Sequence, residues 1–244
     1  MAGLAKGLAI MELFNADTPR LTVNEAAAAT GIAPAVARRC LRTFEELGHV
    51  TYDGKFYRPT PRLMRLAFAY AETDPLPQLA APRLAALRDA FNEASSLAVL
   101  DGDDAVFVAR QQSTHLIATG FRVGTRLPLH ASAAGRVLLS ALPDDEIEER
   151  LSRVVPQRMT SHSLTTRAAI RERVHRARVE GYDVQDQEIE LGLVVVAVPV
   201  VDPAGATVAS ISVSALNTRM PLEEMMDRVL PMLRDEAERL GRVL

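Results

Sequence analysis

Three arginines on one short stretch are the side chains of this chain best suited to bind another molecule. In APAVARRCLRTFEELGHV, residues 33–50, Arg38, Arg39 and Arg42 fall on one side of a helical projection, with Ala35 beside them. The apolar residues occupy roughly 140° of arc on the other side; they are Val36, Ala37, Cys40, Leu41, Phe44 and Leu47. Guanidinium groups are forked donors that suit guanine edges and phosphates. The stretch alone leaves two hypotheses, a nucleic-acid contact and a solvated basic face.

Catalytic chemistry has little support in the sequence. It contains no G-x-S-x-G, H-E-x-x-H, P-loop or G-x-G-x-x-G motif, and its five histidines lack the spacing of metal ligands. The single cysteine, Cys40, excludes a disulfide within the chain and a thiolate zinc cluster. Asp186 and Glu188 would share one face of a strand, where two carboxylates could do acid–base chemistry, but no nucleophile accompanies them. We expect no enzyme, no metal and no cofactor.

The residues around the arginine stretch predict a helix-turn-helix. Thr22 and Glu25 have the spacing of a capping box, and Gly31 has the residue type that ends a helix in a left-handed conformation. Pro34 suits the first turn of the next helix. Two helices separated by so few residues cross steeply, and a further helix over residues 4–15 can close a small core behind them.

A hairpin is predicted directly after the arginine helix. The β-type runs 50–52 and 55–58 are joined by Asp53-Gly54, a strong signal for a two-residue turn. Three helices and a hairpin make a winged helix, whose second paired helix enters the DNA major groove while the wing contacts phosphates. The candidate DNA-binding residues are Thr22, Ala35, Arg38, Arg39, Arg42, Lys55, Tyr57 and Arg58. The alternative is a winged helix that binds protein.

Composition and charge fit this division of the chain. Of 244 residues, 48% are hydrophobic and 24% charged, which is typical of a globular protein with a real core. Residues 1–70 carry nine basic and six acidic side chains, whereas the rest of the chain is acidic. A basic N-terminal part followed by an acidic remainder is typical of a chain that binds a polyanion through its N-terminal part. No apolar run reaches the ~18 residues of a membrane span, so we expect a cytoplasmic protein.

On these motifs the sequence resembles the IclR family of bacterial transcription regulators over nearly its whole length. AKGLAIMELF, LTVNEAAAATGIAPAVARRCLRTFEELGHV and DGKFYRPTPRLMRLAFAY follow the DNA-binding half of that family in order and spacing. ARRCLRTFEELGHV and DGKFYRPTPR are most similar to the branch that controls aromatic-acid catabolism through the β-ketoadipate pathway. Ala33 and Ala35 stand where the family often has Ser or Thr, so operator details do not carry over.

The acidic part of the chain, after residue 70, is predicted to form an α+β domain. A linker helix is expected over 61–80; TDPLP interrupts it and a second helix follows. A hairpin of LAVLD and AVFVAR and a third strand in HLIATGF come next. Helices are expected in ASAAGRVLLSAL, DDEIEERLSRVV, TTRAAIRERVHRARVEG and residues 221–243, with two buried strands around the Asp202–Gly205 turn. The third of these helices has arginines around much of its circumference, which favours a solvated helix. The expected domains are residues 1–60, 61–80 and 81–244, and the resemblance implies that the last is a GAF-like domain for a small effector.

The resemblance also implies which residues line the effector pocket. Matching RVGTRLPLHASAAGRVLLSAL, YDVQDQEIELGL and ASISVS to the family gives Leu129, His130, Ser132, Ala133, Ala134, Gly135, Asp186, Glu188, Ser212 and Ser214. Val195 is added as a candidate because it stands just after the second segment, where family pockets often have a small or polar residue. The alternative is that these residues are core and turn. Small residues at a helix start leave room and expose N–H groups to an anion. The valines at 194–196 supply an apolar wall, which favours an aromatic or partly apolar acid over a two-carbon oxoacid.

The sequence therefore predicts a transcription regulator whose operator binding responds to a small organic acid. The effector must bind one arrangement of the protein better than another, because only differential affinity shifts an equilibrium. The linker helix is expected to pair two subunits into a homodimer, with a dimer of dimers left open. An enzyme with an appended winged helix and a protein-interaction module are the rival hypotheses.

Overall fold

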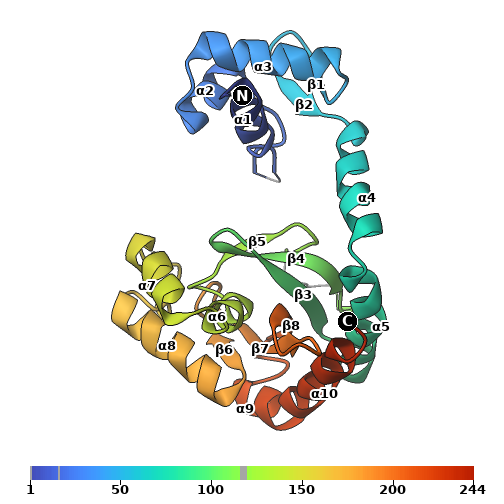
Figure 1. Cartoon of the computed structure of the whole chain (residues 1–244), viewed down its shortest axis with the longest axis vertical. Helices are drawn as coiled ribbons and strands as arrows, with labels where there is room; N and C mark the ends of the chain where they lie inside the picture. The colour runs from blue at the N-terminus through green and yellow to red at the C-terminus, as the bar shows by residue number, and fades with distance from the viewer. Residues whose placement is uncertain (1, 16, 116–119) are drawn as a thin grey trace. The chain divides into compact units, whose positions relative to one another are not determined.

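The computed structural model describes residues 2–15, 17–115 and 120–244. The chain divides into two compact units, residues 1–74 and 75–244 (Figure 1). Of the predicted third strand, HLIATGF, residues 116–119 lie outside the described residues. None of the helices in the described part combines the length and the apolar character that crossing a membrane requires.

The first unit begins with three helices, as the sequence predicts. Helix α1 spans Ala2–Met11, α2 spans Val23–Thr30 and α3 spans Pro34–Glu46. The Thr22 hydroxyl accepts the N–H of Glu25 while the Glu25 carboxylate accepts the N–H of Thr22, so the capping box is formed. These hydrogen bonds lower the pKa of Glu25. A small core joins the helices to the wing; its buried residues are Ile10, Ala26, Ala27, Ala37, Leu41, Val50 and Tyr57.

The wing has a longer turn than the sequence predicts. Strand β1, Val50–Tyr52, pairs with β2, Tyr57–Pro59, and Tyr52 lies opposite Tyr57, so the turn has four residues instead of two. The Asp53 carboxylate accepts the N–H groups of Lys55 and Phe56, which stabilises the wider turn and lowers the pKa of Asp53.

The linker helix and the second helix predicted after the interruption at TDPLP are both present in the structure. A short 3-10 turn, Pro61–Leu63, leads into α4, Met64–Thr73, and α5 runs from Leu76 to Phe91. Leu76 and Ala80 are buried in the core of the second unit, so the boundary between the units falls after Asp74 and not after residue 80. The physical reason is the apolar face of α5, which packs on the sheet.

A six-stranded antiparallel sheet forms the centre of the second unit. Its strands lie in the order β5-β4-β3-β8-β7-β6, and every neighbouring pair is antiparallel. The strands are β3 Ala94–Asp101, β4 Asp104–Gln111, β5 Arg126–Pro128, β6 Asp183–Asp186, β7 Leu193–Val201 and β8 Thr207–Leu216. Helices pack on this sheet, and the α+β prediction is confirmed.

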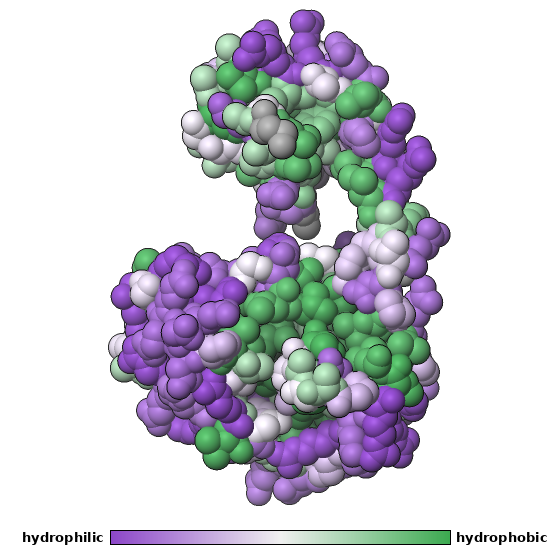
Figure 2. Space-filling view, viewed as in Figure 1, coloured by the Kyte–Doolittle hydropathy of each residue, from purple (hydrophilic) through white to green (hydrophobic). Residues whose placement is uncertain are grey.

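Each face of the sheet is covered by its own helices (Figure 1). Helix α5 and the C-terminal helical segment pack on one face with the largest buried cluster. The helices between β5 and β6 cover the other face with a second cluster. The remaining helical elements are α6 Ala133–Ser140, α7 Asp144–Arg153, α8 Arg167–Glu180, α9 Leu222–Glu224, a π-helical turn Met225–Val229 and α10 Leu230–Gly241. Figure 2 shows apolar side chains over the middle of this unit, between the hydrophilic surfaces of α7 and α8 and of α10.

Candidate functional site

The outer face of α3 is a surface of exposed arginines. Arg38, Arg39 and Arg42 are exposed together with Ala35 near the start of the helix. In the described part of the chain, none of these three guanidinium groups has a carboxylate partner within 4.0 Å. Figure 2 shows hydrophilic side chains along this side of the first unit. Unneutralised guanidinium groups on one helix face are ready to bind an external anion.

The wing carries two exposed cations, but one of its residues predicted to contact DNA is buried. Lys55 and Arg58 are exposed, and Arg20 and Lys55 lie over the Phe56 ring at 4.1 and 5.0 Å from its centroid. Tyr57, predicted to contact phosphates, is only 4% exposed and belongs to the core. Its side chain points inward because its backbone pairs with Leu21 on one side and with β1 on the other. Arg20 was missed, since it lies in a loop without a periodic pattern.

Three arginines of α8 form exposed ion pairs, as the sequence predicts for a solvated helix, whereas Arg173 pairs with the buried Asp183. Arg171 is paired with Glu148, Arg176 with Glu172, and Arg178 with Asp144. Such exposed pairs contribute little to stability, but they neutralise the charge of the helix. The contrast with α3 restricts the candidate polyanion surface to the first unit.

A narrow pocket with a cavity volume of about 20 Å³ lies between the sheet and the start of α6. Its lining combines apolar and aromatic side chains with hydroxyls, one amide and one cation. The lining residues are Ser96, Phe107, Arg110, Phe121, Leu127, Ser132, Ala133, Ala134, Gln185, Val195, Ser212 and Ser214. Cavities of this kind, apolar with a few convergent polar groups, are the usual form of a small-molecule site.

The register of the strands brings these residues onto one face. Ser96 on β3 lies opposite Arg110 on β4 and opposite Ser212 on β8. Two residues along β8, Ser214 lies opposite Val195, which lies opposite Gln185 on β6. Because side chains alternate between the two faces of a strand, this register places the whole row on the cavity side.

A β-bulge explains how Arg110 reaches the cavity. The pairing of β3 and β4 shifts by one residue, so that Leu97 lies opposite Ala109 and Ala98 lies opposite Phe107. Phe107 and Arg110 are three residues apart and would face opposite sides of a regular strand. The extra residue at Val108 turns both onto the cavity face.

The polar groups of the cavity are strongly desolvated. The Arg110 guanidinium donates to Ser96 Oγ at 2.5 Å and lies 5.7 Å from the centroid of the Phe107 ring. Burial lowers the pKa of Arg110. Gln185 is 1% exposed, and its Nε2 has no hydrogen-bond partner among the described residues. A buried donor without a partner is unfavourable, so Gln185 is poised to bond a ligand or a water.

Sequence comparisons place both units in one family. The IclR helix-turn-helix domain matches residues 3–54, and the bacterial transcriptional regulator IclR C-terminal domain matches residues 68–242. The chain belongs to the IclR family of transcriptional regulators. Its winged helix is therefore a DNA-binding domain, and its second unit is the ligand-binding domain of that family.

Several relatives of this IclR-family chain are regulators in aromatic-acid metabolism. The Pca regulon regulatory protein of Pseudomonas putida is 36% identical over 96% of this chain and 80% of its own length. The p-hydroxybenzoate hydroxylase transcriptional activator of Acinetobacter baylyi is 35% identical over 100% of this chain and 92% of its own. The crystal structure of an IclR homologue from Microbacterium hydrocarbonoxydans in complex with 4-hydroxybenzoate superposes with a TM-score of 0.81, at 25% identity, over 98% of this chain and 97% of that one.

Only some of the predicted effector residues of this IclR-family chain lie on the cavity. Those that line it are Ser132, Ala133, Ala134, Val195, Ser212 and Ser214. Leu129, His130, Gly135, Asp186 and Glu188 do not. Leu129 is buried in the core, and burial together with the Arg136 charge lowers the pKa of His130, whose side chain lies on the other side of its loop.

Asp186 and Glu188 do not share a strand face. Strand β6 ends at Asp186, and Gln187 has a φ of 58°, which turns the chain. Both residues nevertheless line a separate, open hollow beside α8. The Glu188 carboxylate is bound by Arg136 at 2.8 Å. Burial raises the pKa of Glu188, and the charge of Arg136 opposes that rise.

Gly135 packs tightly against the turn that precedes α6. A Cβ at this position would stand 2.5 Å from the carbonyl oxygen of Leu129 and 2.7 Å from Ser132 Oγ. We therefore expect Gly135→Ala to lower the free energy of unfolding of the second unit by about 1–3 kcal/mol, the usual cost of overpacking a core. Chemical denaturation monitored by circular dichroism measures this. Substitution of Gly120, where a Cβ meets nothing within 4 Å, is the control, and equal stability of both variants would contradict the prediction.

Metal binding has no structural support in the described residues. No group of three or more His, Cys, Asp or Glu side chains among them could hold a metal ion. The chemistry that the second unit offers is reversible binding by one cation, hydroxyls and an amide.

Proposed function

We propose that this chain is a ligand-responsive regulator that releases or reshapes its operator complex when an aromatic carboxylic acid binds the cavity. The observation that carries the proposal is the lining itself: Arg110 is its one charged side chain among the described residues, and aromatic rings stand beside it. A ligand carboxylate can accept charge-assisted hydrogen bonds from that guanidinium, and an aromatic ring packs against Phe107 and Phe121.

The polar group farthest from Arg110 along the row of strands supports a more specific class. Gln185 on β6 lines the same pocket as Arg110 on β4, and its Nε2 is buried without a partner among the described residues. A ligand with a hydroxyl group away from its carboxylate offers this amide an acceptor. The proposed effector is therefore a hydroxybenzoate, in agreement with the ligand of the Microbacterium hydrocarbonoxydans homologue.

Helix α4 supports a homodimer. Its apolar side chains are exposed on several sides of the helix; Met64, Leu66, Phe68 and Tyr70 are 53%, 65%, 57% and 44% exposed. Apolar exposure of this extent on one short helix indicates an interaction surface. A second copy of the chain is the proposed partner, because a winged helix on a two-fold operator needs a two-fold protein. The proposed site of action is the cytoplasm, where the chromosomal DNA lies.

Fluorescence anisotropy tests the proposal. The purified protein is titrated onto DNA from upstream of its own gene and onto an unrelated fragment near physiological salt. We expect specific binding at least about 10³-fold tighter than binding to the control, and a change in that affinity on addition of 4-hydroxybenzoate. Equal, weak binding to both fragments favours the protein-interaction module, whereas turnover of the added acid favours the enzyme.

The wing is expected to contribute affinity without sequence preference. Lys55→Ala and Arg58→Ala each remove one exposed cation from the wing. Each substitution should weaken binding by a similar factor on operator and control DNA and lower the salt slope of log K by about one. Anisotropy titrations at several salt concentrations measure the slope. A loss confined to the operator would contradict a phosphate contact.

A further inference from the structure

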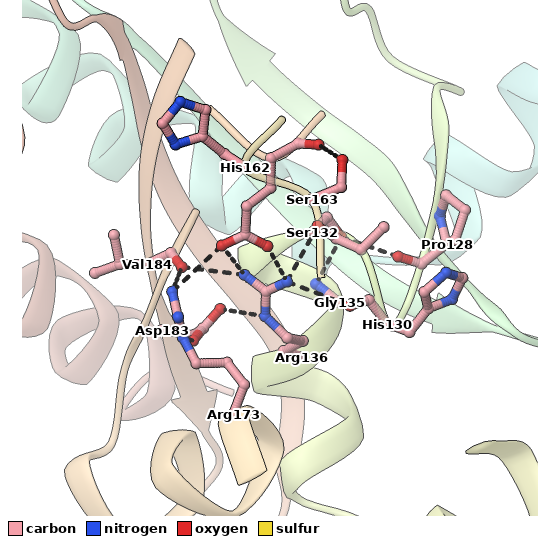
Figure 3. A network of polar contacts seen from close by, with 12 residues as sticks. Pro128, His130, Ser132, Gly135, Arg136, His162, Ser163, Arg173, Asp183 and Val184 are labelled. Atoms are coloured by element: carbon pink, nitrogen blue, oxygen red, sulfur yellow. Dashed lines mark hydrogen bonds and ion pairs between the residues drawn. The ribbon is translucent and has the colours of Figure 1, made fainter. Parts of the chain in front are cut away.

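The Arg136 side chain joins segments that are far apart in the sequence. It is fully buried on α6, and its Nε donates to Asp183 at 2.7 Å. One terminal nitrogen donates to the carbonyl oxygens of His130 and Ala131 at 3.2 Å and to Glu188 at 2.8 Å. The other donates to the Val184 carbonyl oxygen at 3.0 Å. Figure 3 shows this guanidinium at the centre of the network.

These contacts lie directly beside two walls of the effector cavity. His130 and Ala131 precede Ser132, Ala133 and Ala134, which form the wall at the start of α6. Val184 precedes the cavity residue Gln185, and Asp183 lies two residues before it on the same strand. One side chain therefore holds the α6 wall and the β6 wall at a fixed separation.

We infer that Arg136 is a positioning residue that sets the distance between these two walls and thereby the discrimination between effectors. The inference rests on the proposed function, since it assigns Arg136 to the aromatic-acid site. Arg136 does not line the cavity and acts through Gln185 and the α6 wall. A flat, forked guanidinium can satisfy this many acceptors at once, which an ammonium group cannot do.

The charged groups around Arg136 compensate one another and fix the positions of the segments that they join. Arg173 binds Asp183 at 2.8 Å and also reaches the Val184 carbonyl, so two guanidinium groups balance two buried carboxylates. The Glu188 backbone is held in turn, because Ser163 Oγ donates to its carbonyl oxygen at 2.6 Å. A fully satisfied buried network of this kind fixes a unique arrangement.

The test compares Arg136→Lys with Arg171→Lys. The control also loses a bidentate arginine–glutamate pair, but Arg171 and Glu148 are exposed and lie outside the cavity. Isothermal titration calorimetry with 4-hydroxybenzoate and benzoate gives the ratio of the two Kd values for each full-length protein. We expect Arg136→Lys to weaken 4-hydroxybenzoate at least tenfold and to bring the ratio close to one, while Arg171→Lys changes neither.

A double-mutant cycle separates positioning from general destabilisation. In a Gln185→Leu background the amide that distinguishes the two probes is gone, so Arg136→Lys should change the ratio by less than twofold. The inference is overturned if Arg136→Lys weakens both probes equally, or if its effect on the ratio persists without Gln185. If Arg136→Lys does not fold, Glu188→Gln removes one carboxylate charge with little change in shape and is subject to the same two criteria.

A measurement without ligand keeps the inference distinct from the proposed function. Hydrogen–deuterium exchange of the unliganded protein should be faster in Arg136→Lys at residues 130–134 and 183–188, and unchanged in Arg171→Lys. If the unsubstituted protein binds neither probe, the proposed aromatic effector is wrong, while the exchange data still show whether Arg136 fixes the two walls. Unchanged exchange at these residues would overturn the positioning role.

Discussion

Arg110→Met is expected to abolish the response of operator binding to 4-hydroxybenzoate and to raise the Kd for that acid at least about 30-fold. The proposed partner of the carboxylate is the buried guanidinium beside Phe107. Removing one member of a buried charge pair costs about 2–5 kcal/mol, because the other charge stays desolvated without a partner. Each 1.4 kcal/mol is a factor of ten in Kd. Calorimetry on the purified variant measures the loss.

The matched control for this prediction is Arg126→Met. Arg126 is an arginine of the neighbouring strand β5, paired with Asp101 and Asp104 at the surface and absent from the cavity lining. Its variant should bind 4-hydroxybenzoate as the unsubstituted protein does, and Arg110→Met should still bind operator DNA. A Kd for Arg110→Met within threefold of the unsubstituted protein would remove Arg110 from the effector site.

The first unit was predictable because its signals are local. The capping box at Thr22, the left-handed Gly31 and the proline at the start of α3 each act within a few residues of their own position. The errors in this unit also have local causes. The Asp53 side chain widens the turn of the wing, and the pairing of Tyr57 with Leu21 turns the tyrosine into the core.

The cavity depends on contacts between distant segments, which no local pattern contains. Arg110 was missed because regular alternation along β4 would place its side chain on the other face of the strand from Phe107. Only the bulge brings both side chains onto the cavity face. Gln185 was not predicted, and the nearby Asp186 and Glu188 were named instead. The register of β6 against β7 decides which of these residues faces the cavity, and the local sequence does not contain that register. The ion pair of Glu188 was not predicted, because its partner, Arg136, lies 52 residues earlier. Resemblance supplied Ser212 and Ser214, which the structure places on the cavity.

Because the chain folds as two compact units, substitutions on α3 should impair DNA binding and leave effector binding intact. The triple substitution Arg38→Ala, Arg39→Ala and Arg42→Ala is expected to weaken operator binding at least about 100-fold and to leave the Kd for 4-hydroxybenzoate unchanged. A residue that reads a base contributes about 1–3 kcal/mol, and three separate contacts add approximately. The substituted side chains are exposed on α3, and alanine is the strongest helix former, so the fold of the first unit should be retained.

Net charge alone must be excluded as the cause of this loss. A second triple variant, with Arg171, Arg176 and Arg228 replaced by alanine, removes the same charge from exposed ion pairs of the second unit. Because such pairs contribute little and lie outside the winged helix, this variant should bind the operator within about threefold of the unsubstituted protein. If both triple variants lose affinity equally, the long-range field of the protein and not the face of α3 governs binding. If only the α3 variant loses affinity, and does so more on the operator than on unrelated DNA, its arginines read sequence, because phosphate contacts alone would weaken both complexes alike.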